Sequence, residues 1–358
     1  MNSDQIPVEF IVSRYMVKYV RLDQLIQFAF KGSEATHINL YIDLYGLYRT
    51  LMSRNYRTDM SDYTALTVSI INICAHYRAY FKRIGVSTTI FLISSYNLPE
   101  ESLQLIPAYN KTFQEKLQSK SLREMIELNI ELLDILCPYL PSIYFIKTQF
   151  ESATMINYLV RTECLKGNED PNIIISSDLY PIQLVNKYNN TVFLRPIKQY
   201  HEDNSVITLP KDSEGFDEMF WAVVTRSRSK IGVSEHLGDI RACNFEYLQI
   251  LNSFPERNLP VILNITMAKR YIMQATNGAN IPLTLDMLYE LSPDLSNRVP
   301  METMRPRWKV LNLEYQDASF RNSLEPKITH YEDLSDPGAV QMINSKYFAN
   351  NPIDLLRL

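Results

Sequence analysis

The chain has 358 residues, a formal net charge of −4, 46% hydrophobic residues and 21% charged residues. This balance is typical of a folded protein with one large or two ordinary domains, and no apolar run reaches the roughly 18 residues of a membrane-spanning helix. The slightly acidic charge does not by itself indicate a nucleic-acid-binding protein. Because the N-terminus lacks a basic stretch followed by an apolar one, we expect no secretory signal and a cytoplasmic location.

Two common kinds of cofactor site are disfavoured by the composition. The chain has 9 glycines, and neither GxGxxG nor GxxxxGK[ST] occurs. Such loops need glycine so that the backbone can approach phosphates, and we therefore expect no nucleotide cofactor. The four cysteines, Cys74, Cys137, Cys164 and Cys243, are widely spaced and form no CxxC pair. We expect them to be apolar thiols rather than zinc ligands.

The first 37 residues are predicted to form a helical extension. After them, apolar runs predict strands at 38–45, 86–94, 142–147 and 172–178. Apolar residues at helical spacing predict helices at 62–84, 121–136 and 151–166, and again at 245–254 and 265–275. Because hairpin turn signals between the strands are rare, the alternation predicts an α/β fold with a mainly parallel central sheet flanked by helices.

Three acidic residues fall at or just after the ends of predicted strands. Asp43 lies near the end of the first strand, Asp178 ends the last, and Glu151 begins the helix after the third. Ligands of parallel sheets bind at the carboxyl ends of the strands, so the three acids are expected to converge where an active site belongs. Alternatively, Asp43 and Asp178 cap helices or accept hydrogen bonds from loops.

Five segments, in chain order, resemble motifs of the 5′-nuclease superfamily, which includes flap endonucleases and bacteriophage 5′-3′ exonucleases. They are YIDLYGLYR at 41–49, PAYNKTF at 107–113, ESAT at 151–154, SSDLYPIQL at 176–184 and LNSFPERNLPVILNITMA at 251–268. The resemblance spans about residues 38–275. It implies a PIN-like core at 38–200 with a helical arch at about 95–140. A degenerate helix-turn-helix region would follow at 201–290, and a C-terminal extension of unknown fold at 291–358.

The resemblance also implies a metal site. In the family, two divalent ions activate water and stabilise the leaving oxygen, and carboxylates hold ions of this kind. Asp43, Glu151 and Asp178 match ligand positions. Five other acid positions carry other residues: Ser94 or Ser95, Ala153, Thr154, Tyr180 and Arg257. Three carboxylates provide for one weakly bound Mg²⁺ or Mn²⁺ or for none.

Contacts to nucleic acid are implied at two kinds of position. The family's helix-turn-helix glycines, which approach a DNA phosphate, are replaced by Val261, Asn264 and Thr266, so the grip on duplex DNA is expected to be weakened. The basic residues that could contact a nucleic acid are Arg49, Lys111, Lys116, Lys120, Arg226, Arg228 and Lys230. A solvated helical face explains the arch lysines equally well.

The expected function is that of a catalytically impaired or inactive 5′-nuclease-like protein. It would bind branched or single-stranded DNA, or a protein partner in replication or in a virion. One alternative is an active Mg²⁺- or Mn²⁺-dependent 5′-3′ exonuclease or flap endonuclease with a one-metal site. The other is a structural or assembly protein of a bacteriophage, located in the host cytoplasm.

Overall fold

The structure is a computed structural model of the whole chain. It describes residues 10–12, 15–21, 35–44, 63–95, 100–109, 111, 115, 120–148, 150–168, 170–176, 180–184, 191–197, 220–224, 247, 250–251, 259–277, 283–313, 315, 337–348 and 353.

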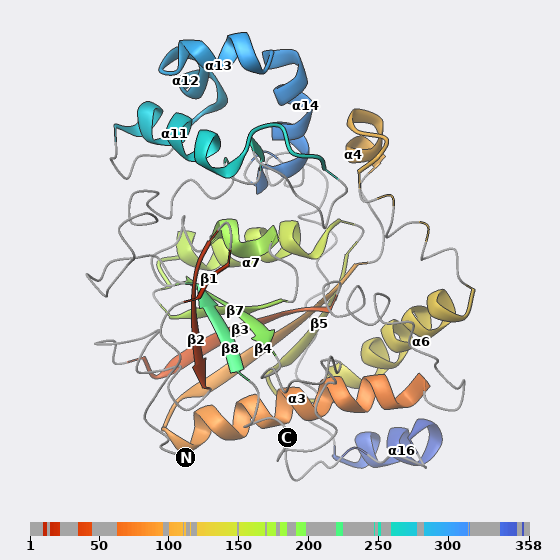
Figure 1. Cartoon of the computed structure of the whole chain (residues 1–358). Helices are drawn as coiled ribbons and strands as arrows, with labels where there is room; N and C mark the ends of the chain where they lie inside the picture. The colour runs from red at the N-terminus through yellow and green to blue at the C-terminus, as the bar shows by residue number, and fades with distance from the viewer. Residues whose placement is uncertain are drawn as a thin grey trace.

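A single twisted sheet of eight strands forms the centre of the molecule (Figure 1). Its order is β1-β2-β8-β7-β6-β3-β4-β5. The strands are β1 (Phe10–Val12), β2 (Tyr15–Arg21), β3 (His37–Asp43), β4 (Ser87–Ser94), β5 (Ile143–Lys147), β6 (Asn172–Ile175), β7 (Thr191–Ile197) and β8 (Phe220–Val224). The strands from β7 to β5 pair in parallel, and β1, β2 and β8 add an antiparallel edge beside β7. The predicted α/β fold with a mainly parallel sheet is therefore confirmed.

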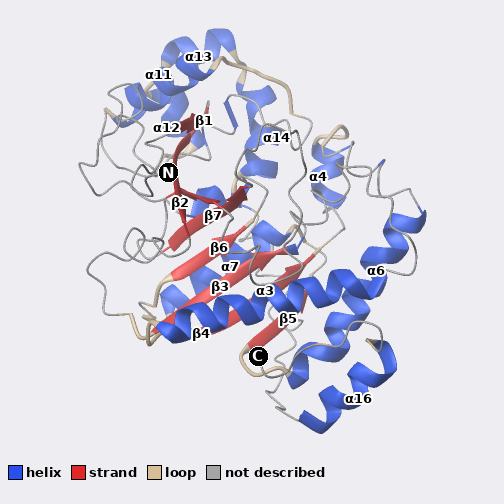
Figure 2. Ribbon diagram, turned by 60° about the horizontal axis from the view of Figure 1, so that its bottom comes forward, coloured by secondary structure: helices blue, strands red, loops and turns tan. Residues whose placement is uncertain are grey.

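Helices cover both faces of the sheet, as Figure 2 shows for α3 and α7. The helices and 3-10 turns are α3 (Tyr63–Arg83), α4 (Glu100–Leu105), α6 (Lys120–Leu136), η2 (Cys137–Tyr139), α7 (Ser152–Leu165), η3 (Tyr180–Gln183), α11 (Ile265–Thr276), α12 (Leu285–Glu290), α13 (Pro293–Arg298), α14 (Met301–Leu311) and α16 (Pro337–Tyr347). On one face α3, α6 and α16 share a core with the sheet. On the other, α7 lies between the sheet and the group α11–α14 (Figure 1).

The alternation of strand side chains divides the core between the two faces. On β3, Leu40 and Ile42 pack against α3 and α6, whereas Tyr41 packs on the α7 side. On β6, Ile173 belongs to the core shared with α3 and α6, and Ile174 belongs to the core on the α7 side. Both faces of these central strands are buried, which explains why their sequences are nearly continuous apolar runs.

Three sequence-based expectations about the flanking segments need correction. The first 37 residues contain strands β1 and β2, so the predicted helix is wrong there: β2 pairs with β8 and extends the sheet. Strand β8 also lies inside the region 201–290 that was expected to be helical. The predicted arch, at about 95–140, includes α6, but Ile130 and Leu133 of α6 are buried against the sheet. That helix is therefore part of the core.

No helix within the described ranges is both long enough and apolar enough to cross a membrane.

Candidate functional site

The carboxyl edge of the parallel strands carries a cluster of buried polar side chains. Asp43, the last residue of β3, is 3% exposed. Ser176 follows β6, the neighbouring strand, and its hydroxyl donates a hydrogen bond of 2.6 Å to Oδ2 of Asp43. A hydroxyl–carboxylate bond of this length is typical of a charge-assisted hydrogen bond. The carboxylate of Asp43 is thus held by the protein itself.

Glu151 lies at the same edge, just before α7. Its side chain is 1% exposed and forms no capping hydrogen bond with the first turn of the helix. The backbone carbonyl of Glu151 instead accepts from the amides of Thr154 and Met155, at 3.0 and 3.3 Å. Glu151 is therefore the N-cap of α7 through its backbone, and its carboxylate does not cap the helix.

Four hydroxyl side chains lie at or near the same edge of the sheet. Ser94 ends β4 and Ser95 follows it, Thr148 follows β5, and Thr154 lies in the first turn of α7; all four are buried. The carbonyl of Ser94 accepts from the Thr148 amide at 3.0 Å, which ties the two strand ends together. A hydroxyl is neutral, so it compensates the charge of a divalent ion less well than the carboxylates that Mg²⁺ sites use.

The described residues provide a poor site for a pair of divalent ions. Within them, no group of three or more His, Cys, Asp or Glu side chains is placed to hold a metal. Asp178, the third predicted ligand, lies outside the described residues. Asp43 and Glu151 remain as the charged donors that could hold a single ion at this edge.

Tyr180 occupies a position where the family resemblance implies an aspartate. Its ring is fully buried, and its hydroxyl donates to the carbonyl of Val310 at 2.8 Å. Next to it, Gln183 donates to the carbonyl of Leu311 at 2.8 Å and accepts from the amide of Leu313 at 3.3 Å. These bonds therefore anchor the end of α14 to the carboxyl edge of the sheet.

The start of α11 shows how the glycine replacements act. Asn264 is the N-cap of α11, and its side-chain oxygen accepts from the Met267 amide at 2.9 Å. This amide is one of the donors that an anion at a helix N-terminus uses. Val261, 60% exposed, projects its side chain just before the helix. The local geometry thus supports a weakened contact to phosphate.

Two of the predicted nucleic-acid-binding lysines form ion pairs on the surface. Lys111 lies 3.7 Å from Glu115 and Lys120 lies 3.6 Å from Glu124, both at i,i+4 spacing. Exposed pairs of this kind contribute about 0.3–0.5 kcal/mol, so a phosphate could displace either glutamate at small cost. Contact with nucleic acid stays a prediction for both lysines.

The remaining predicted contacts, Arg49, Lys116, Arg226, Arg228 and Lys230, lie outside the described residues.

Two of the cysteines are buried as the sequence predicted. Cys74 in α3 and Cys137 in η2 belong to the core on the α3 side of the sheet. Burial raises the pKa of the Cys74 thiol to about 12 and that of Cys137 well above its ordinary value. Both thiols are therefore protonated near neutral pH, which makes them poor metal ligands.

One pocket was not anticipated from the sequence. It has a volume of about 350 Å³ and lies between α4 and α14. Its lining residues are Leu105, Met301, Glu302, Arg305, Pro306 and Lys309. The helical spacing of Met301, Arg305 and Lys309 places these three residues on one face of α14. Leu105 is almost two hundred residues away in the chain, so no sequence pattern predicts that it lies beside them.

The chain matches no protein-family model, and no curated protein matches it in sequence. In overall structure it is similar to a flap endonuclease of bacteriophage T5 in complex with DNA and metal ions. The identity is 13%, the TM-score is 0.48, and the match covers 86% of this chain and 99% of that one.

Two further similarities are to human GEN1 in complex with Holliday junction DNA and to the catalytic core of Rad2 in complex with a DNA substrate. The first has 10% identity and a TM-score of 0.44, and covers 93% of this chain and 71% of that one. The second has 13% identity and a TM-score of 0.44, and covers 96% of both chains. The strand order and the connections between strands establish the α/β fold of the chain independently of these similarities.

Proposed function

We propose that the chain is a 5′-nuclease-like protein that binds DNA and has lost efficient phosphodiester cleavage. The proposal rests on the resemblance of its ordered motifs to that family and on the parallel sheet that brings Asp43 and Glu151 to one edge. A protein of this kind retains the shape of a nuclease but lacks the carboxylates that hold two divalent ions.

The hydrogen bond from Ser176 to Asp43 is the observation that carries the proposal. Cleavage by two metal ions needs carboxylates that are available to the ions. Here a buried hydroxyl donates to Asp43, and either Ser94 or Ser95, together with Thr154, occupies a position where the family resemblance implies an acid. If one Mg²⁺ or Mn²⁺ does bind, Asp43 and Glu151, together with Asp178, would hold it, and it would polarise a phosphate oxygen.

Cleavage and binding should be measured on the same DNA with the full chain. Nicked and flapped substrates labelled at the 5′ end are incubated with Mg²⁺, with Mn²⁺ or with EDTA, and binding is followed by fluorescence anisotropy. We expect salt-sensitive binding, because phosphate contacts release counterions. We also expect no metal-dependent product beyond that of the EDTA sample.

Two results would contradict the proposal in different ways. Robust turnover with Mn²⁺ that Asp178→Asn abolishes would show an active one-metal nuclease. Absence of salt-sensitive binding to any of these DNAs would instead favour a structural or assembly role. Lys346→Ala, a change of an exposed cation on the distant α16, serves as the charge control for the binding measurement.

A further inference from the structure

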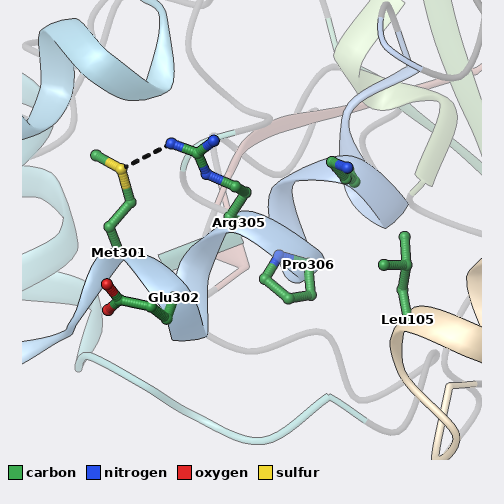
Figure 3. A pocket seen from close by; sticks show the side chains of 6 residues that line it. Leu105, Met301, Glu302, Arg305 and Pro306 are labelled. Atoms are coloured by element: carbon green, nitrogen blue, oxygen red, sulfur yellow. Dashed lines mark hydrogen bonds between the residues drawn. The ribbon is translucent and has the colours of Figure 1, made fainter.

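The pocket between α4 and α14 is lined by none of the residues named above for the carboxyl edge of the sheet. Leu105 of α4 forms one wall, and one face of α14 forms the rest. In Figure 3 Leu105 approaches α14 on the side of Pro306, and the guanidinium of Arg305 turns toward Met301. The carboxylate of Glu302 points away from that guanidinium.

The two cations of the pocket, Arg305 and Lys309, have no acidic partner among the residues that the structure describes. Arg305 is exposed, and its guanidinium donates to the thioether sulfur of Met301 at 3.2 Å, which is a weak acceptor. Lys309 lies one turn further along α14. Within the described part of the chain, neither side chain forms an ion pair with a carboxylate. This contrasts with Lys111 and Lys120, which both have a glutamate nearby.

An apolar surface and an aromatic ring adjoin the cations. Met301, Pro306 and Leu105 provide the apolar part of the lining. The ring of Tyr315 lies beside Lys309, with the ammonium 5.6 Å from the ring centroid. Tyr315 is itself only half-buried and contacts Trp308, with ring centroids 5.2 Å apart.

From this arrangement we infer that the pocket binds one nucleotide unit of single-stranded DNA. Arg305 and Lys309 bind its phosphate, and the base lies against the apolar wall or stacks on Tyr315. Proteins hold single strands without reading their sequence by combining cations with aromatic rings on which bases stack, and the half-buried ring of Tyr315 lies beside Lys309. An acidic peptide would also satisfy the two cations, but it would gain less from the aromatic ring.

The inference rests on the proposed DNA-binding function and adds a location and a strand type to it. The segment after α4 supports the assignment, because it leads through the buried Tyr109 to Lys111, which is exposed. A strand that leaves the pocket along this segment would meet a third cation, Lys111. The pocket therefore lies on a surface that could follow an extended, negatively charged chain.

The test compares single-stranded oligothymidine with duplex DNA, by fluorescence anisotropy on the full chain over a series of salt concentrations. The double variant Arg305→Ala/Lys309→Ala should weaken single-strand binding. It should also make the negative slope of log K against log salt shallower by about 0.7, which is the contribution of one single-strand phosphate. Tyr315→Ala should weaken binding by at least about fivefold with the slope unchanged, since it removes stacking rather than charge.

Arg298→Ala is the matched control, because it removes an exposed cation from the neighbouring helix α13, outside the pocket. It should leave both the affinity and the slope as in the wild type. The double replacement Arg305→Lys/Lys309→Arg should retain the salt slope. Circular dichroism and the melting temperature of each variant show whether a loss of binding reflects unfolding.

Three outcomes would overturn the inference. If the wild type binds single strands and the double alanine variant binds them equally well, the pocket is not the site, although the proposed function stands. If an acidic peptide binds the wild type, and the double alanine variant loses peptide binding but keeps single-strand binding, the pocket belongs to a protein partner. If the wild type binds no DNA at all, the proposed function fails and the inference fails with it.

Discussion

At the scale of single residues, the buried polar cluster is stabilised by hydrogen bonds within the protein. The Ser176 hydroxyl donates a hydrogen bond to the buried carboxylate of Asp43 and so replaces part of the solvation that the carboxylate has lost. A buried carboxylate without such partners is costly. The hydroxyl should therefore contribute to folding stability in the absence of any ion.

Ser176→Ala tests this contribution. We expect it to lower the free energy of unfolding by about 1.5–3 kcal/mol, the usual worth of a hydrogen bond to a charged group. Urea denaturation in the presence of EDTA measures the change. Ser345→Ala removes a hydroxyl that bonds to the Gln341 carbonyl on an exposed surface, and it should have a much smaller effect. Equal effects of the two variants would show that the Asp43 contact is unimportant.

At the scale of elements, the start of α11 is where the chain departs from a phosphate-binding helix. Asn264 lies where the motif resemblance implies a glycine, and it caps the helix with its own side chain. The cap satisfies the Met267 amide. Restoring glycine would free this amide without lengthening or bending the helix.

Asn264→Gly is expected to strengthen binding to duplex DNA by about two- to fivefold, since an anion at a helix N-terminus gains about 0.3–1 kcal/mol. Loss of the cap should cost only a few tenths of a kcal/mol. Asn264→Asp is the matched control: it keeps a capping oxygen but adds negative charge, and it should weaken binding. Fluorescence anisotropy with nicked duplex DNA measures the affinity of the wild type and of both variants. Identical affinities would show that the start of α11 does not contact the DNA.

Most elements of the core could be predicted from the sequence, and the antiparallel edge could not. The strands β3, β4, β5 and β6 are buried on both faces, so each appears as an apolar run with a helix after it. Strands β1, β2 and β8 have no such signature, and their positions depend on pairing between segments about two hundred residues apart. Local periodicity does not encode partners at that distance.

The candidate site was predictable only in part, for a related reason. Asp43 and Glu151 could be found because they stand at the ends of predicted elements. The hydrogen bond from Ser176 to Asp43 depends on β3 and β6 being neighbours in the sheet. The pocket depends on the packing of α4 against α14. These relations belong to the tertiary structure and leave no trace in the spacing of residues.

At the scale of the whole molecule, the core on the α7 side joins the sheet to the C-terminal helices. Tyr41, Ile93 and Ile174 of the strands belong to the same cluster as buried residues of α11, α12, α13 and α14. The sequence instead suggested separate units at 38–200, 201–290 and 291–358, and these boundaries stay predictions. A shared core favours cooperative unfolding of the sheet and these helices.

Ala268→Asp should therefore lower the midpoint of one common unfolding transition, because it places a charge at a fully buried position of α11. Far-UV circular dichroism and tryptophan fluorescence, recorded during urea denaturation, should shift together. Thr266→Asp, an exposed change in the same helix, is the control and should leave the midpoint nearly unchanged. Two separated transitions, of which only one responds to Ala268→Asp, would show that the helices form an independent domain.

The hydrogen bond between Tyr180 and Val310 joins the segment after β6 to the end of α14. Tyr180 is fully buried, so an aspartate at this position would lose the bond and place a charge where water does not reach. The attachment of α14 thus depends in part on a phenol that lies 130 residues earlier in the chain.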